Sequence, residues 1–218
     1  MSERSLTPNT IPSRKDAAID TREKILRAAI TTVRAHGIAG ATTRAIAAEA
    51  GIAEGSIYRH FSDKIDAIQT AVVEYLVPSY REYMGELPEK AGTATPAIRL
   101  REVLRKTMAF YRDLIPLMAV LYSENALRER YQAQLIDSRG PHRASEAVAD
   151  YLAAEQSLGR LPSGIDPQAA AQMLLGACFQ QVFFEQTIGK DRLQLSERTL
   201  IAKMVQTLTD RGPGATSE

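Results

Sequence analysis

The sequence predicts an all-α protein in which a three-helix N-terminal domain precedes a larger helical domain. Apolar residues recur at spacings of three and four through most of the chain, which is the period of an amphipathic helix. Glycine and proline cluster between these segments, where helices are expected to end. No segment alternates apolar and polar residues as a half-buried strand does. With 218 residues and 44% hydrophobic content, the chain can bury a substantial core.

The chain is expected to divide into three parts. Residues 1–19 carry Pro8, Pro12 and several Ser and Thr residues, which favours a flexible N-terminal arm. We assign residues 20–66 to the three-helix domain and residues 67–218 to the larger helical domain.

The first predicted helix begins after Asp20 or Thr21 and runs to about His36. Leucine, isoleucine, valine and alanine recur along it at helical spacing, and Gly37 follows as a stop signal. We expect this helix to support the two shorter helices that follow it.

Residues 41–61 predict two short helices joined by a tight turn. Thr42 or Thr43 can cap the first helix, because a hydroxyl oxygen accepts a hydrogen bond from an unpaired backbone N–H of the first turn. Gly51 stands where a left-handed residue ends a helix without a Cβ clash. The second helix is expected from about Glu54 to His60.

The second short helix has more polar side chains than packing requires. Only Ile57 and Phe61 look like core residues, which leaves Ser56, Tyr58, Arg59 and His60 without an evident structural role. Two short helices around a tight turn, with the second one polar and exposed, are typical of a DNA-binding helix-turn-helix.

The segment GIAGATTRAIAAEAGIAEGSIYRHFSDKIDAI resembles the N-terminal DNA-binding segment of the TetR/AcrR family of bacterial transcriptional regulators. The resemblance covers roughly residues 20 to 68. It rests on an ordered set of residues: Gly40, Thr42, Thr43, Ile46, Ala47, Ala50, Gly51, Gly55, Ser56, Tyr58, Arg59, His60, Phe61 and Lys64. The resemblance implies a homodimeric repressor that a small molecule releases from its operator.

Within this motif, the expected DNA contacts fall into two groups. Phosphates would be held by cationic and hydroxyl-bearing side chains, and base edges would be approached from the second helix. The residues that we expect at the interface are Thr43, Arg44, Glu54, Gly55, Ser56, Tyr58, Arg59, His60 and Lys64.

The chain departs from the family pattern at two positions. Ala53 opens the second helix where Ser or Thr is usual, so a side-chain cap worth about 1 kcal/mol is absent. Glu54 stands where many members place a basic residue. Its carboxylate would repel a phosphate or accept a hydrogen bond from a cytosine amino group.

The fourth helix is expected to begin at Ser62 and to join the two domains. Ile65, Ile68 and Val72 fall on one face of it, and Pro78 should kink or end it because proline lacks a helical donor. A loop over 85–96 separates it from further helices predicted at 97–113, 117–138, 141–157, 167–188 and 196–210.

The last two predicted helices are the expected dimer surface. Residues 169–184 are apolar almost all around, which requires burial on more than one side. In the family that the chain resembles, these two helices pair with their copies in a four-helix bundle. A dimer also suits a palindromic operator, because two heads about 34 to 36 Å apart meet successive major grooves.

The larger domain is expected to bind a small, largely apolar effector. Aromatic and methionine side chains on its central helices can line a cavity or form ordinary core. The candidates are Tyr111, Met118, Tyr122, Tyr151, Met173 and Phe179.

Composition excludes several other functions. The formal net charge is only +1, so DNA binding must depend on a local surface. A lone cysteine, Cys178, gives no disulfide framework, and His36, His60 and His142 lack metal-ligand spacing, so we expect no metal and no cofactor. The absence of a secretion signal and of about 20 consecutive apolar residues predicts a cytoplasmic protein without a membrane anchor.

Two alternatives stay open at this stage. A helical carrier or scaffold would bind hydrophobic ligands without specific DNA binding, and an enzyme would act on an apolar substrate. The enzyme lacks a grouping of nucleophile, base and oxyanion donors, and the carrier leaves the polar second helix unexplained. We therefore predict a DNA-binding regulator and not an enzyme.

Overall fold

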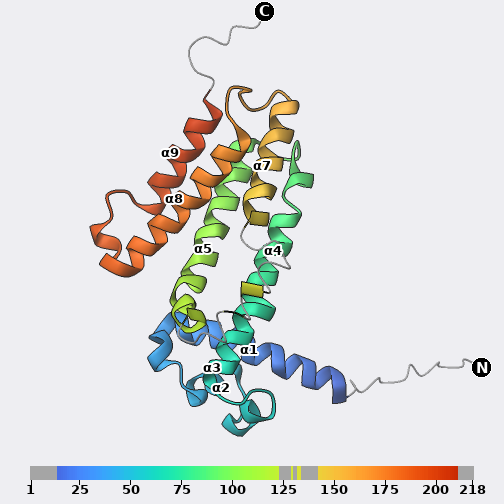
Figure 1. Ribbon diagram of the computed structural model, residues 1–218, viewed down its shortest axis with the longest axis vertical. Helices are drawn as coiled ribbons and strands as arrows, with labels where there is room; N and C mark the ends of the chain where they lie inside the picture. The colour runs from blue at the N-terminus through green and yellow to red at the C-terminus, as the bar shows by residue number, and fades with distance from the viewer. Residues whose placement is uncertain (1–13, 123–128, 130–131, 134–141, 211–218) are drawn as a thin grey trace, which may run out of the picture. The chain divides into compact units, whose positions relative to one another are not determined.

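The computed structural model describes residues 14–122, 129, 132–133 and 142–210, and its described regular elements are all helical (Figure 1). This confirms the predicted fold class. The chain separates into two compact units, residues 1–68 and 69–218. Over the described residues, no helix is both long and apolar enough to cross a membrane.

The N-terminal unit begins with helix α1 (Arg14–Gly40), which contains a kink at Gly37. Gly37 has φ 67°, a left-handed conformation that interrupts the helix where the sequence predicts a stop. The helix begins at Arg14, earlier than the predicted start after Asp20 or Thr21, so residues 14–19 of the expected arm are helical. The rest of that arm, residues 1–13, lies outside the described residues.

Helix α2 (Thr43–Ala50) and the 3₁₀-helix η1 (Glu54–Arg59) follow. Both are short, and each contributes apolar side chains to one small core with α1. That core is made of fully or almost fully buried residues, among them Ile25, Ala29, Val33, Ile46, Ala47, Ile57 and Phe61. Because η1 is too short to be stable alone, its position depends on the packing of its apolar residues in this core.

A third helix, α3 (Lys64–Ala71), continues through a π-helical turn, η2 (Val72–Leu76), into helix α4 (Val77–Gly85). Pro78 stands at the start of α4, where its missing N–H does least harm. A wider turn directly before a proline accommodates the ring that an α-helical turn would clash with. The predicted interruption is thus present, although the chain stays helical through it.

The C-terminal unit contains a short 3₁₀ turn, η3 (Pro88–Lys90), and then helix α5 (Pro96–Tyr122). The expected break between 113 and 117 is wrong, because α5 runs through Pro116 without interruption. The helix predicted at 117–138 falls largely outside the described residues.

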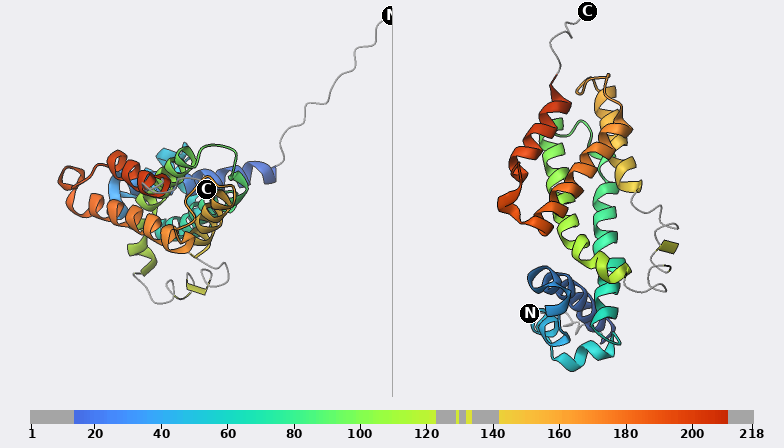
Figure 2. Two further views of the ribbon diagram at one scale, coloured as in Figure 1. Left: turned by 90° about the horizontal axis from the view of Figure 1, so that it is seen from above. Right: turned by 60° about the vertical axis from the view of Figure 1, so that its left-hand side comes forward.

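Three longer helices and one 3₁₀ turn complete the described part of this unit: α7 (His142–Ser157), α8 (Pro167–Ile188), η4 (Lys190–Arg192) and α9 (Glu197–Thr209). Helix α8 packs on α5 and α7, α9 packs on α5, and α4 packs on α7 (Figure 2). Their shared core includes Leu100, Leu104, Met108, Tyr151 and Cys178, all at most 1% exposed.

Candidate DNA-reading surface and ligand cavity

The turn between α2 and η1 is built from local hydrogen bonds. Thr42, and not Thr43, caps α2 by accepting a hydrogen bond from the backbone N–H of Ala45 at 3.1 Å. Gly51 ends α2 in the left-handed conformation at φ 66°, as the sequence predicts. Ala53 begins η1 without a side-chain cap, so the start of η1 depends on packing.

Two apolar side chains hold η1 to the rest of the N-terminal unit. Ile57 is fully buried and Phe61 is 4% exposed, in agreement with the sequence prediction. The guanidinium of Arg22 lies 5.6 Å from the centre of the Phe61 ring, which adds a cation–π contact from α1.

The polar side chains of η1 stay accessible within the chain. Tyr58 is 58% exposed, Arg59 is exposed, and Ser56 and His60 are half-buried. Arg44 on α2 is also exposed. Each of these side chains is thus at least partly accessible, as contact with a groove of DNA requires.

Three of the predicted contacts are joined to one another. The hydroxyl of Thr43 donates a hydrogen bond of 2.6 Å to the carboxylate of Glu54, and the hydroxyl of Tyr58 donates a longer one of 3.4 Å to Thr43. The carboxylate of Glu54 thus has a partner inside the protein. This cluster orients Tyr58 across the junction of α2 and η1.

Lys64 has a structural partner as well. Its ammonium donates a hydrogen bond of 3.1 Å to the backbone carbonyl of Ile38, which lies just after the kink of α1. An ammonium has three donors, so this bond positions Lys64 and leaves two donors for a phosphate.

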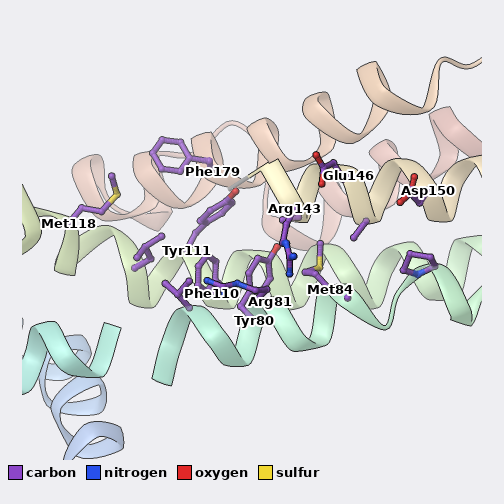
Figure 3. A pocket seen from close by; sticks show the side chains of 16 residues that line it. Tyr80, Arg81, Met84, Phe110, Tyr111, Met118, Arg143, Glu146, Asp150 and Phe179 are labelled. Carbon is purple, nitrogen blue, oxygen red and sulfur yellow. The ribbon is translucent and has the colours of Figure 1, made fainter. Parts of the chain in front are cut away.

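The C-terminal unit contains a cavity of about 480 Å³ among α4, α5, α7 and α8 (Figure 3). This volume is in the range of small-molecule sites in proteins. Its lining is mainly apolar and aromatic, with Tyr80, Met84, Phe110, Tyr111, Leu114, Met118 and Phe179 among the residues.

Aromatic rings in the lining contact one another in pairs. Tyr80 and Phe110 stack almost parallel, with ring centres 3.9 Å apart and an angle of 6° between planes. Tyr111 meets Phe179 edge to face at 5.4 Å. These contacts fix the rings and give the cavity flat apolar walls.

The structure brings only part of the predicted ligand set to this cavity. Tyr111, Met118 and Phe179 line it, whereas Tyr151 is buried in the core away from it and Met173 is 75% exposed on α8. Tyr151 and Met173 therefore do not line this cavity. The side chain of Tyr122 lies outside the described residues.

Sequence reasoning missed the contributions of α4 and α7. Tyr80 and Arg81 follow Pro78, where the fourth helix was expected to kink or end, and Arg143 stands at the start of α7. The spacing of apolar residues along one helix does not show which other helix closes a cavity, so the sequence carries no clear signal for these residues.

Burial keeps the phenols and the thiol of this region neutral. Desolvation raises the pKa of Tyr111 to about 12 and the pKa of Cys178 to about 12. A thiol with such a pKa carries almost no thiolate at neutral pH, and Cys178 is fully buried in the core of the C-terminal unit. Among the described residues, no group of three or more His, Cys, Asp or Glu side chains is arranged to hold a metal ion.

Comparison with known proteins supports both halves of this description. Residues 25–66 match the family model for bacterial regulatory proteins of the tetR family. Residues 99–211 match the model for the C-terminal domain of AefR-like transcriptional repressors.

Individual relatives are distant and cover different shares of the chain. The transcriptional repressor BepR of Brucella suis is 41% identical over 58 residues, which is 27% of this chain and 28% of BepR. The uncharacterized regulator YerO of Bacillus subtilis is 26% identical over 113 residues, which is 52% of this chain and 39% of YerO. The chain thus spans about two fifths or less of the length of these two curated relatives.

Solved structures that align with nearly the whole chain include SmeT. SmeT, the repressor of the multidrug efflux pump SmeDEF of Stenotrophomonas maltophilia, is 25% identical with a TM-score of 0.56. The alignment covers 91% of this chain and 98% of SmeT.

Proposed function

This chain belongs to the TetR family of bacterial transcriptional regulators, and we propose that it is a homodimeric repressor released from a palindromic operator by a small, largely apolar effector. Regulators of this family bind DNA and small-molecule ligands, act as dimers and are not enzymes.

The observation that carries the DNA-binding proposal is the pairing of buried and exposed residues on η1. Ile57 and Phe61 fix the helix, while Tyr58 and Arg59 on the same short segment are exposed. We assign phosphate contacts to Arg44, Tyr58, His60 and Lys64, and base contacts to Ser56, Arg59 and the backbone near Gly55. Thr43 and Glu54 adjoin both groups.

Repression and effector release are supported by the relatives and by the cavity. SmeT and BepR are both described as repressors, and SmeT is known in a complex with triclosan. The cavity of this chain has the volume and the apolar lining of a small-molecule site. A ligand that binds better to a dimer state with misplaced heads would weaken operator binding by that difference in affinity.

Dimerisation is supported by the exposed face of α8. Met173, Phe184 and Ile188 are 75%, 42% and 49% exposed, respectively. Large apolar side chains clustered on one exposed helix face usually mark an interaction surface.

A titration with the protein's own upstream DNA tests the proposal. Fluorescence anisotropy with a labelled duplex should give sequence-specific binding whose affinity falls steeply with salt, because phosphate contacts release counterions. A scrambled duplex of equal length is the control. Equal, weak binding to both duplexes would contradict a specific operator and favour a carrier of hydrophobic ligands.

A further inference from the structure

Two arginine side chains line the ligand cavity, and neither forms an ion pair with another described residue of the chain. Arg81 on α4 and Arg143 on α7 both line it. The arginine ion pairs in the described part of the chain involve other residues, such as the pair of Arg112 with Glu185 and the pair of Arg160 with Glu155. Two cations near one apolar cavity favour an anion there, since attraction is stronger where water is partly excluded.

Both arginines are directed toward the aromatic part of the cavity. Figure 3 shows Arg81 beside Phe110 and Tyr80, with Arg143 extending from α7 toward them. Arg81 is half-buried and Arg143 is exposed. The shielded Arg81 is therefore the stronger partner for an anion, and Arg143 contributes a weaker, salt-sensitive attraction.

The two carboxylates of the lining are placed differently. Glu146 and Asp150 are both exposed, and in the close view they point away from the aromatic rings (Figure 3). Solvent screens exposed charges, so these carboxylates offer a cationic ligand little attraction at the rings.

The rings define the shape of the other part of the ligand. Phe110 stacks on Tyr80 almost in parallel, and Tyr111 and Phe179 form a second, edge-to-face pair. A flat ring can extend such an arrangement by an offset stack or an edge contact. A bulky saturated ring would lose these contacts.

We propose that this cavity binds planar aromatic anions, with the ring system among Phe110, Tyr111 and Phe179 and the acidic group on Arg81. The proposal rests on the proposed effector-binding function and names the chemical class of its ligand. A guanidinium binds a carboxylate or sulfonate through charge-assisted hydrogen bonds, which are stronger than neutral ones.

A pair of matched fluorescent probes tests the charge requirement. The probe 1-anilinonaphthalene-8-sulfonate and its neutral analogue N-phenyl-1-naphthylamine share one ring skeleton, and both brighten in apolar surroundings. The full chain should bind the sulfonate about tenfold more tightly, because hydrogen bonds to charged groups carry that much affinity. Equal affinity, or tighter binding of the neutral probe, would overturn the proposal.

Three variants assign the effect to the cavity. Arg81→Gln should weaken sulfonate binding about tenfold and leave neutral binding within about twofold, whereas Arg81→Lys should restore part of the preference. The control Arg192→Gln removes an exposed arginine on η4 and should change neither affinity. An Arg81→Gln chain that melts like the parent and keeps the full preference for the sulfonate would refute the assignment.

Release of operator DNA by each probe is measured in a separate titration. The ligand class of the cavity and its control of DNA binding can then be tested independently. Sulfonate binding that depends on Arg81 but leaves the operator complex intact supports the ligand class and contradicts effector control through this cavity. Release by neutral apolar compounds alone, with no preference for the sulfonate, overturns the ligand class and leaves the proposed regulator in place.

Discussion

Within η1, neighbouring side chains have opposite environments. Ile57 is fully buried, and the next residue, Tyr58, is 58% exposed. Because six residues cannot form a stable helix alone, the buried residue fixes the position of the helix, and the proposed DNA contact belongs to the exposed one. A substitution at Ile57 and one at Tyr58 should therefore fail in different ways, the first by unfolding and the second by loss of binding.

Arg44 and Arg59 provide a direct test of the division between phosphate and base contacts. Arg44→Ala should weaken binding to all sequences and lower the salt slope by about 1, because one phosphate contact is lost. Arg59→Ala should cost about 1 to 3 kcal/mol on the operator and relax preference at one base pair. Anisotropy titrations against the operator and its single-base variants measure both. Parent-like binding by both variants would show that the surface is assigned wrongly.

Glu54 offers a second test at this scale, since its carboxylate already accepts a hydrogen bond of 2.6 Å from Thr43. Glu54→Gln keeps an acceptor for that bond and removes a charge that repels phosphates. We expect binding to any duplex to rise by about threefold, or about 0.7 kcal/mol, at low salt. If Glu54 instead reads a cytosine amino group, the variant will lose affinity for the operator alone.

Ion pairs that the sequence does not reveal join several helices of the C-terminal unit. Arg112 on α5 forms an ion pair with Glu185 on α8 at 2.8 Å and another with Glu197 on α9. The side chain of Glu185 is only 9% exposed, and the hydrogen bonds from Arg112 lower its pKa. This arrangement joins three helices at one residue.

Replacing Arg112 should destabilise the C-terminal unit and change its response to acid. Arg112→Ala is expected to cost about 2 kcal/mol, because a largely buried carboxylate loses its main partner. Glu185 has a lowered pKa when folded, so its contribution is present above the unfolded pKa of 4.5 and is lost as the pH falls below it. The variant should therefore show a shallower loss of stability below pH 4.5.

Urea unfolding at several pH values measures this effect. Arg105→Ala is the matched control, because Arg105 is an exposed residue of the same helix and its removal should stay within about 0.5 kcal/mol. Equal stability of Arg112→Ala and Arg105→Ala would show that the ion pairs of Arg112 contribute nothing to the free energy of unfolding.

Local rules predicted the elements better than the contacts between them. The glycine stops at Gly37 and Gly51 follow from backbone sterics alone, and the structure has both. The helix break predicted near Pro116 is wrong, because packing on both sides of α5 outweighs the loss of one hydrogen bond. Helical spacing made both Tyr111 and Tyr151 ligand candidates, but only Tyr111 lines the cavity. A cavity forms where neighbouring helices leave space unfilled, and this depends on the angles and distances between them.

At the scale of the whole molecule, the unsatisfied surface of α8 implies a partner. Met173, Phe184 and Ile188 are exposed on a helix whose other side packs on α5 and α7. Phe179 and Phe183 continue from the cavity toward this surface, with stacked rings 6.1 Å apart. The cavity and the proposed dimer surface thus share one helix, which gives a ligand a short physical route to the dimer geometry.

Phe184 gives the test of that surface. Phe184→Lys places a charge in the proposed interface and should raise the dimer dissociation constant by at least about tenfold, or about 1.4 kcal/mol. Ile98→Lys is the matched control, because Ile98 is 58% exposed on α5 and lies outside the two C-terminal helices. Sedimentation velocity over a range of concentrations measures association. Binding to a full palindrome should weaken in parallel for the Phe184 variant, while binding to a half-site stays unchanged, since each monomer keeps an intact η1. A Phe184→Lys chain that remains dimeric at the concentrations of the parent would remove α8 from the interface.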